Sequence, residues 1–516
     1  SSILFILSAL TIRPCAQVTM RVQLYDPCCG EKQRLVSRHV ASEFLATPKQ
    51  FFGVDWLWEA IGVISDQGSD TKTLLLTASG LQPLAAGCSI AVPFVLRGMN
   101  LGPSQVAVFT ALCHAPEVLG ALVAVTTDSG SVTWLGTECS VTRRQCLILA
   151  AAVQAVSMYY MISPQSVIVF LAAASILNVS IAVSRRLLDA INAQFTRTLS
   201  HSAASDFVAT KHALNGVFGL PIFGLASMVA GVGDAHALIA MSAFCPVALA
   251  VAASRWEEAP KADFLQQTGP ASVLALKSSM NLMLGPAALC YLQSAIPTSG
   301  DAMFFYYTNV LLLDMRFMAL LAAAESASRL ASVIAYREVG VNMGPRQAQV
   351  VQTVAVLGGG VLHGILLAHL LPDELSWGLV LVRGVSLAFV HQMCEIPIQA
   401  TMQRLSVPGR EGVVTSTFSA VASSSALFNS LVTSQATRIL GITPSCFDAV
   451  PKLIALQCAG TALSLPASCL LPSEDAVDKL QKAADATEQT EEPSGASSSC
   501  QDTQLPTTAS WTSSEH

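Results

Sequence analysis

Two groups of ionisable residues fall inside long apolar stretches of this chain, where an ionised side chain costs from about 2.5 to over 10 kcal/mol. Glu325 and Arg329 are four residues apart, so on a helix they share a face and can pair. Arg383, His391 and Glu395 follow at spacings of eight and four, again one helical stripe. Two interpretations stay open: self-neutralising groups that face the inside of a bundle, or cavity-facing groups that exchange partners with an anion or a proton. Arg383 lies nearest a stretch end, where snorkelling is a further explanation.

Glu117 and the run Pro297-Thr298-Ser299-Gly300-Asp301 are the other polar features within apolar sequence. Glu117 has no basic neighbour in sequence, and removal from water favours the neutral form of a carboxyl group, as a proton carrier requires. The alternative is that Glu117 lies in a water-filled vestibule and has no role in transport. The run places five weakly helical residues in an apolar stretch, and a broken helix exposes backbone groups where it lines a cavity. We therefore expect a solute site at Pro297 and Asp301, with a kinked but packed helix as the alternative.

The elements that carry these residues are indicated by the distribution of Lys and Arg. Between Thr73 and Pro472, apolar stretches of about twenty residues alternate with gaps, and thirteen basic residues fall in every second gap. The remaining gaps and their edges hold Arg97, Arg316, Arg438 and Lys452. Cytoplasmic loops of membrane proteins carry such an excess, which predicts one basic, cytoplasmic face. The thirteen residues are Arg143, Arg144, Arg185, Arg186, Arg197, Lys211, Arg255, Lys261, Lys277, Arg337, Arg346, Arg404 and Arg410.

Composition agrees with a chain that lies in a bilayer. Hydrophobic residues make up 52% of the 516 and charged residues 12%, well below the roughly 25% of soluble domains. We expect an all-α polytopic membrane protein of the plasma membrane or of an organelle, a plastid included. Twelve transmembrane helices in two six-helix halves are expected over 74–97, 104–127, 143–163, 165–187, 206–232, 236–255, 279–312, 315–337, 347–371, 376–403, 412–440 and 450–471.

The two halves are similar in layout. The first stretch carries Pro83 and Pro93, as the seventh carries Pro286 and Pro297, which suggests corresponding interruptions, with prolines that only kink a packed helix as the alternative. The expected organisation is an N-terminal cytoplasmic segment (1–72), a six-helix bundle (73–255), a polar cytoplasmic linker (256–278), a second six-helix bundle (279–472) and a disordered cytoplasmic tail (473–516). The tail is rich in Ser, Thr, Glu and Gln.

Motifs of several other function classes are absent from the sequence. There is no phosphate-binding Walker loop, which argues against direct use of ATP. Most of the fourteen Cys fall in apolar stretches without the clustered spacing of a zinc site. We therefore expect no enzyme activity, no cofactor, no metal and no nucleic-acid partner; the lipid bilayer is the expected surrounding.

One segment is similar to a signature of a known family. Ile296 to Asn309, followed by Leu312, resembles the seventh span of the folate-biopterin transporter family, a branch of the major facilitator superfamily. Arg143-Arg144 resemble the basic pair of that family, and Pro408 to Gly412 resembles its entry to the eleventh span. The resemblance covers about residues 75 to 472.

The resemblance implies a major-facilitator fold and proton-coupled uptake of a folate or pterin by two rocking bundles. Phe304 and Tyr306 would then contact the flat ring of the solute, with interfacial anchoring as the alternative. The chain departs from the family pattern in the fourth span, where Arg185 stands in place of an Asp and only Asp189 matches. Because that change weakens the assignment of a substrate, two alternatives remain: a transporter of another organic solute such as S-adenosylmethionine, and a transport-dead receptor or scaffold.

Overall fold

The computed structural model divides the chain into two compact units, residues 1–59 and 60–516, and every described residue belongs to the second. The predicted segment 1–72 and tail 473–516 therefore lie almost wholly outside the described residues, as does most of the predicted linker. The structure describes 69–115, 131–134, 137–140, 142–162, 166–196, 201–231, 235–256, 283–340, 343–370, 372–405, 411–472, 476–477 and 479.

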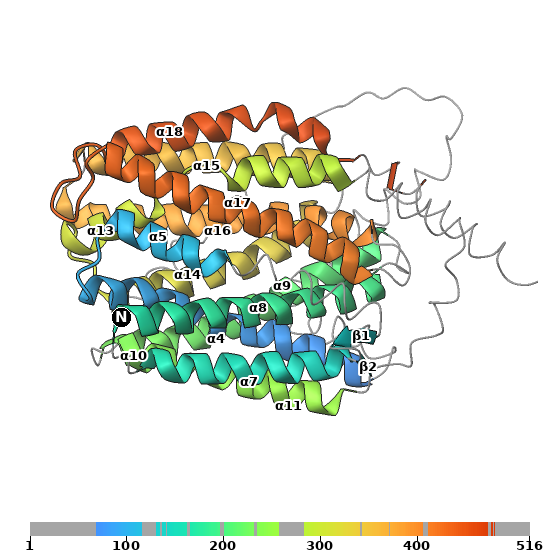
Figure 1. Ribbon diagram of the computed structural model, residues 1–516. Helices are drawn as coiled ribbons and strands as arrows, with labels where there is room; N and C mark the ends of the chain where they lie inside the picture. The colour runs from blue at the N-terminus through green and yellow to red at the C-terminus, as the bar shows by residue number, and fades with distance from the viewer. Residues whose placement is uncertain are drawn as a thin grey trace, which may run out of the picture. The chain divides into compact units, whose positions relative to one another are not determined.

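The first half of the described unit is a series of helices with one short hairpin (Figure 1). The hairpin pairs β1 with β2, Val132 standing opposite Cys139, and is a small addition to the predicted all-α fold. The elements are α4 (Ser69–Gly98), α5 (Pro103–His114), β1 (Ser131–Trp134), β2 (Thr137–Ser140), α7 (Arg143–Ile162), α8 (Val167–Thr196), α9 (His201–Gly231), α10 (Ala235–Ser242) and α11 (Phe244–Arg255).

The second half begins with a helix over 283–294, followed by a break at 295–299. Its other elements are α13 (Gly300–Asn309), α14 (Met315–Ala335), the π-helical turn η2 (Tyr336–Gly340), α15 (Pro345–Leu367), α16 (Asp373–Arg404), α17 (Glu411–Ile439), α18 (Val450–Leu463) and the 3-10 turn η3 (Pro466–Leu470). Side-chain caps define some boundaries. Asp314 Oδ1 accepts a hydrogen bond from Phe317 N at 2.8 Å at the start of α14, a strong N-cap.

Nine spans in the described part of the chain are long and apolar enough to cross a membrane. The other three predicted spans correspond to α5, to the broken helix 283–309 and to the hydroxyl-rich α17, so the count of twelve stays a prediction. Large apolar side chains face outward, as a lipid surrounding requires; Leu149, Ile168 and Met228 are 66%, 77% and 74% exposed. This is a multi-pass membrane protein.

Two sequence expectations about the spans, an interruption of the first and the end of the fourth, are wrong. The first span, α4, is continuous through Pro83 and Pro93, so of these two corresponding spans the seventh is interrupted and the first is not; a membrane helix tolerates Pro because neighbouring groups bond the freed backbone. The fourth span continues to Thr196 instead of ending at 187, so Arg185 and Arg186 lie inside α8 and not in a gap. Lys211 likewise lies inside α9.

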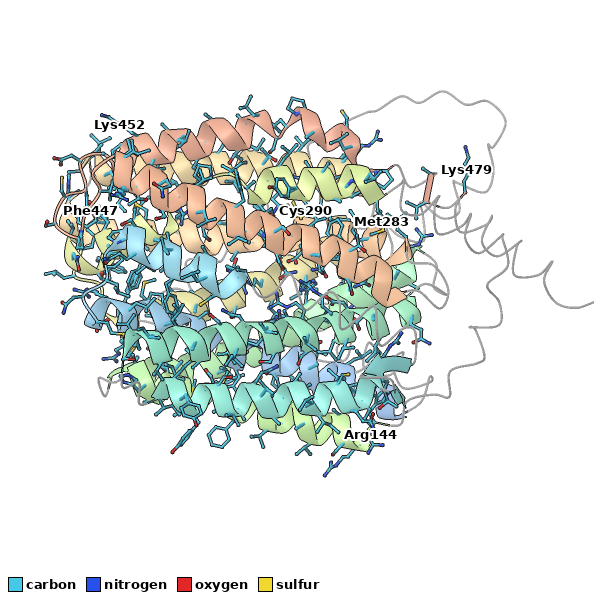
Figure 2. The ribbon with its side chains drawn as sticks, viewed as in Figure 1. Arg144, Met283, Cys290, Phe447, Lys452 and Lys479 are labelled. Carbon is cyan, nitrogen blue, oxygen red and sulfur yellow. The ribbon has the colours of Figure 1, made fainter. Side chains whose placement is uncertain are left out.

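The helices have two chemically different ends. We call the basic end the one that carries Arg143, Arg144, Arg255, Arg337, Arg346 and Arg404. At the opposite end the chain reverses through residues with positive φ, namely Asn100, Leu312, His369 and Gly441. Figure 2 shows Arg144 and Phe447 at these two ends of the helices.

Helices of the two halves pack against each other most extensively in two places. α17 contacts α5 and α8, and α9 runs along α14 (Figure 1). Along the second contact, a Cβ atom added at Gly216 would lie 3.2 Å from backbone atoms of Leu330, and one at Gly219 would lie 2.6 Å from Ser326 Oγ. Glycine thus permits a close approach of two helix backbones, as is common between membrane helices.

Candidate functional site

A cavity of about 650 Å³ lies between the two halves of the helical unit. Most of its lining residues lie in the part of each helix nearer the basic end, such as Gln82 of α4, Asn192 of α8 and Phe418 of α17. Figure 2 shows two further lining residues, Met283 near the basic end and Cys290 further along the helices. The cavity therefore belongs to both halves and extends from the basic end to the middle of the helices.

Four predicted site residues line this cavity: Asp189, Arg329, His391 and Glu395. The two predicted pairs with a spacing of four form as expected. Arg329 Nη2 lies 3.6 Å from Glu325 Oε2, and His391 Nδ1 lies 3.5 Å from Glu395 Oε2. Glu325 is not itself a lining residue.

Asp189 has a partner that the sequence did not identify. Its Oδ1 lies 3.7 Å from Nζ of Lys211, which stands on the neighbouring α9 and also lines the cavity. Both side chains are partly exposed, at 30% and 23%, so the pair faces the cavity instead of the protein interior.

A chain of polar contacts connects the two halves across the cavity. Gln399 Nε2 donates a hydrogen bond to Glu395 Oε1 on the same helix, α16. Gln399 Oε1 in turn lies 3.2 Å from His212 Nε2 on α9. The contacts therefore run from His391 through Glu395 and Gln399 to His212. Sequence reasoning missed the last two; Gln399 continues the stripe of His391 and Glu395 by four residues, which was a usable signal, whereas His212 gave none.

Carboxamide side chains are the commonest polar group of the lining. Asn192 Oδ1 and Gln392 Nε2 are buried and have no hydrogen-bond partner among the described residues. A carboxamide presents a donor and an acceptor side by side, which suits a polar ring that has both. The ten are Gln82, Gln154, Asn192, Asn215, Gln293, Gln349, Gln352, Gln392, Gln399 and Gln403.

The helix break is held by protein side chains. Thr298 N donates to Thr433 Oγ1 at 3.0 Å. Both the backbone N and the hydroxyl of Ser299 donate to Gln457 Oε1 at 2.9 Å. Pro297 and Asp301 are not lining residues of the cavity. The groups freed by the break are thus bonded to α17 and α18, and a direct role for Pro297 or Asp301 with a solute stays a prediction.

The two predicted ring-binding aromatics also lie away from the cavity lining. Phe304 packs edge-on against Phe94 of α4, with ring centroids 5.0 Å apart, which joins the two halves near the opposite end. Tyr306 is 2% exposed and packs against Phe447, with ring centroids 5.6 Å apart. In this conformation both side chains are packing residues.

The remaining predicted residues are separated from the lining as well. Arg383 Nε donates to the Gly359 carbonyl oxygen of α15 at 3.3 Å, so this residue does not join its stripe partners in the cavity. Glu117 lies outside the described residues. Within the described ranges, no three His, Cys, Asp or Glu side chains converge as a metal site.

The adjacent arginines of α8 point to different places. Arg186 is buried and donates to the Ser419 carbonyl oxygen at 3.2 Å and to Ser423 Oγ at 3.0 Å, both on α17. Arg185 is exposed and lines the cavity. One residue along a helix turns the side chain by about 100°, which accounts for the separation.

Comparisons with known proteins extend these observations. The chain is 21% identical over 196 residues to Folate transporter 1 of Plasmodium falciparum (isolate 3D7), a match that covers 37% of this chain and 38% of that protein. Folate transporter 2 of the same organism is 26% identical over 206 residues, 39% of this chain and 44% of that protein. The chain thus spans less than half the length of each of these relatives.

Solved structures share the arrangement of helices. The major facilitator superfamily proton:xylose symporter XylE has a TM-score of 0.55 at 12% identity and covers 80% of this chain and 98% of its own. The nucleoside transporter NupG has a TM-score of 0.54 at 10% identity, with 78% and 99% covered. The human organic anion transporter MFSD10 has a TM-score of 0.53 at 14% identity, with 78% and 98% covered. At such identities the likeness concerns the fold alone.

A family model gives the assignment. The model described as the BT1 family matches residues 88–491, which confirms the family and the major-facilitator fold predicted from the sequence. With its two packed sets of helices and a polar cavity between them, the chain belongs to the BT1 family.

Proposed function

We propose that this protein is a secondary transporter that carries a folate, a pterin or a related small organic solute by alternating access. The observation that carries the proposal is the cavity of about 650 Å³ shared by two helical halves. Pockets for small molecules have about 300 to 1,000 Å³. Family membership and the similarity to the two Plasmodium folate transporters support this solute class over an enzymatic role.

The proposed conformation is open toward the basic end and closed at the opposite end. Contacts between the halves at the opposite end support it: Ser434 Oγ of α17 donates to the Ser104 carbonyl oxygen of α5 at 2.9 Å, and Phe94 meets Phe304. The excess of Arg at the basic end supports a cytoplasmic orientation for that end. The halves would correspond to 73–255 and 279–472, joined by the linker 256–278.

Proton coupling is the second part of the proposal. The contacts from His391 through Glu395 and Gln399 to His212 support it, because they contain a carboxyl group and two imidazoles and cross from one half to the other. Gain or loss of a proton at Glu395 or His391 would change the strength of contacts that hold the halves together. A change in charge would in this way be coupled to rocking of the bundles.

Uptake measurements test the proposal. The full chain is expressed in a host that lacks its own uptake of these solutes, and entry of labelled folate, biopterin and S-adenosylmethionine is measured with and without a pH gradient. Correct insertion is verified by surface labelling. We expect uptake of folate or biopterin that rises when the outside is acidic.

Other results would redirect the assignment. Uptake of S-adenosylmethionine alone would identify a transporter of a different solute. If correctly inserted protein takes up none of the three solutes, the transport proposal is contradicted and a receptor or scaffold is favoured.

A further inference from the structure

The permanently charged basic residues of the cavity wall do not all have a carboxylate partner. Lys211, Arg329 and Arg185 are its permanently charged basic residues among the described lining residues. Lys211 lies 3.7 Å from Asp189, and Arg329 lies 3.6 Å from Glu325. Two of the three cations thus have a carboxylate partner within the protein.

Arg185 is the third cation, and its guanidinium has no ion pair or hydrogen bond to any described residue. Asp189 stands one turn further along the same helix and could reach Arg185 from there, but its carboxylate is directed to Lys211. The other lining carboxylate, Glu395, receives a hydrogen bond from Gln399 and contacts His391. Each acid of the lining is therefore engaged elsewhere.

The position of Arg185 along α8 distinguishes it from a loop cation. Thr196 ends the helix eleven residues later, about 16 Å further along the axis at 1.5 Å per residue. Arg185 therefore lies well inside the helical bundle, exposed to the cavity. A guanidinium at such a depth needs a partner or a wet cavity, and a planar carboxylate fits its two parallel N–H donors.

We infer that Arg185 binds a carboxylate of the transported solute and makes the cavity selective for anionic cargo. This inference rests on the proposed function and adds the chemical class of one end of the solute: a carboxylate tail at Arg185, with the carboxamides available to a polar ring. The Asp-to-Arg departure in the fourth span then contributes to anion binding instead of counting against it. Asp at this position would repel a carboxylate that Arg attracts.

Binding by the full chain, purified in detergent micelles, tests the inference with two fragments of folate. p-Aminobenzoylglutamate carries the anionic tail without the pterin ring, and biopterin carries the ring without the tail. Because a charge-assisted bidentate pair is lost, Arg185→Gln is expected to weaken binding of the tail fragment about tenfold and to leave biopterin binding within about twofold. Arg438→Gln, which removes an exposed cation at the far end of α17, is the control and should change neither.

Each outcome has a defined meaning. Unchanged affinity of Arg185→Gln for the tail fragment overturns the inference, as does an equal loss for both fragments. Arg185→Lys keeps the charge and is expected to fall between the wild type and the glutamine variant; equality of both variants with the wild type also overturns it. If the wild type fails to transport folate but binds the tail fragment through Arg185, the transport proposal fails while the carboxylate site stands. If the wild type binds no carboxylate, the site is refuted.

Discussion

The imidazole Nε2 of His212 lies 3.2 Å from the amide oxygen of Gln399 and thereby joins α9 of the first half to α16 of the second. Gln399 also donates to Glu395, so the contact between the halves leads directly to an ionisable pair. Separation of α9 from α16 must break the His212 contact. The strength of the contact between His212 and Gln399 therefore depends on the charge of Glu395.

Substitution of Glu395 tests that link. Glu395→Gln removes the titrating carboxyl group but keeps an oxygen that can accept from Gln399. We expect accumulation driven by a pH gradient to fall at least about fivefold, the lower range of a coupling free energy between sites, while exchange of labelled for unlabelled solute continues. Parallel assays of accumulation and exchange in proteoliposomes measure the two. Glu338→Gln, an exposed acid of η2, is the matched control; full accumulation by Glu395→Gln would remove Glu395 from the coupling proposal.

The contact of α9 with α14 predicts a difference between two glycines of one helix. Gly219→Ala would place a methyl group 2.6 Å from the buried Ser326 Oγ, so we expect a loss of about 1 to 3 kcal/mol in the free energy of unfolding. Gly224→Ala meets no atom within 4 Å and should leave stability unchanged or raise it by up to about 1 kcal/mol. Thermal unfolding in detergent, followed by tryptophan fluorescence, compares them. Equal melting temperatures would show that the helices separate easily at Gly219.

The bonding of the helix break predicts a role for Gln457 in stability. Gln457→Leu leaves the backbone N–H and the hydroxyl of Ser299 without their acceptor, which should cost about 1 to 3 kcal/mol. Gln457→Glu keeps acceptor oxygens and should cost less. Unfolding temperatures and biopterin affinity of both variants provide the measurement. A loss of biopterin affinity with unchanged stability would indicate that the helix break forms part of the solute site.

Two native cysteines test the orientation. Cys446 and Cys469 are both exposed, the first in the turn between α17 and α18 and the second in η3 at the other end of α18. A membrane-impermeant maleimide added to intact cells that carry the protein in the plasma membrane should label Cys446, and Cys446→Ser should remove that label. Cys469→Ser should have no effect on it. The reverse pattern would place the basic end outside.

The local sequence was sufficient to predict the bounds of several helices and the ion pairs formed within one helix. Apolar length identified α7 and α15 to within four residues at either end, and a spacing of four predicted the Glu325–Arg329 and His391–Glu395 contacts. Such features depend on one helix at a time.

Contacts between helices could not be predicted in the same way. His212 and Gln399 are 187 residues apart, and their contact depends on which faces of α9 and α16 meet. The end of α8 was misplaced because charged residues inside an apolar stretch resemble a loop when the cavity they face is unknown. Gln457 bonds Ser299 across 158 residues, so a break that suggested exposed backbone is in fact satisfied.

Gly219 stands near the middle of α9, eighteen residues from His201 and twelve from Gly231. The close approach to α14 therefore acts as a fulcrum with arms of about 27 and 18 Å at 1.5 Å per residue. Rotation about a fulcrum between two arms moves their ends in opposite directions. If the proposed rocking turns on this contact, widening of the bundle at the basic end necessarily narrows it at the other, and a solute in the cavity meets an exit on one side only.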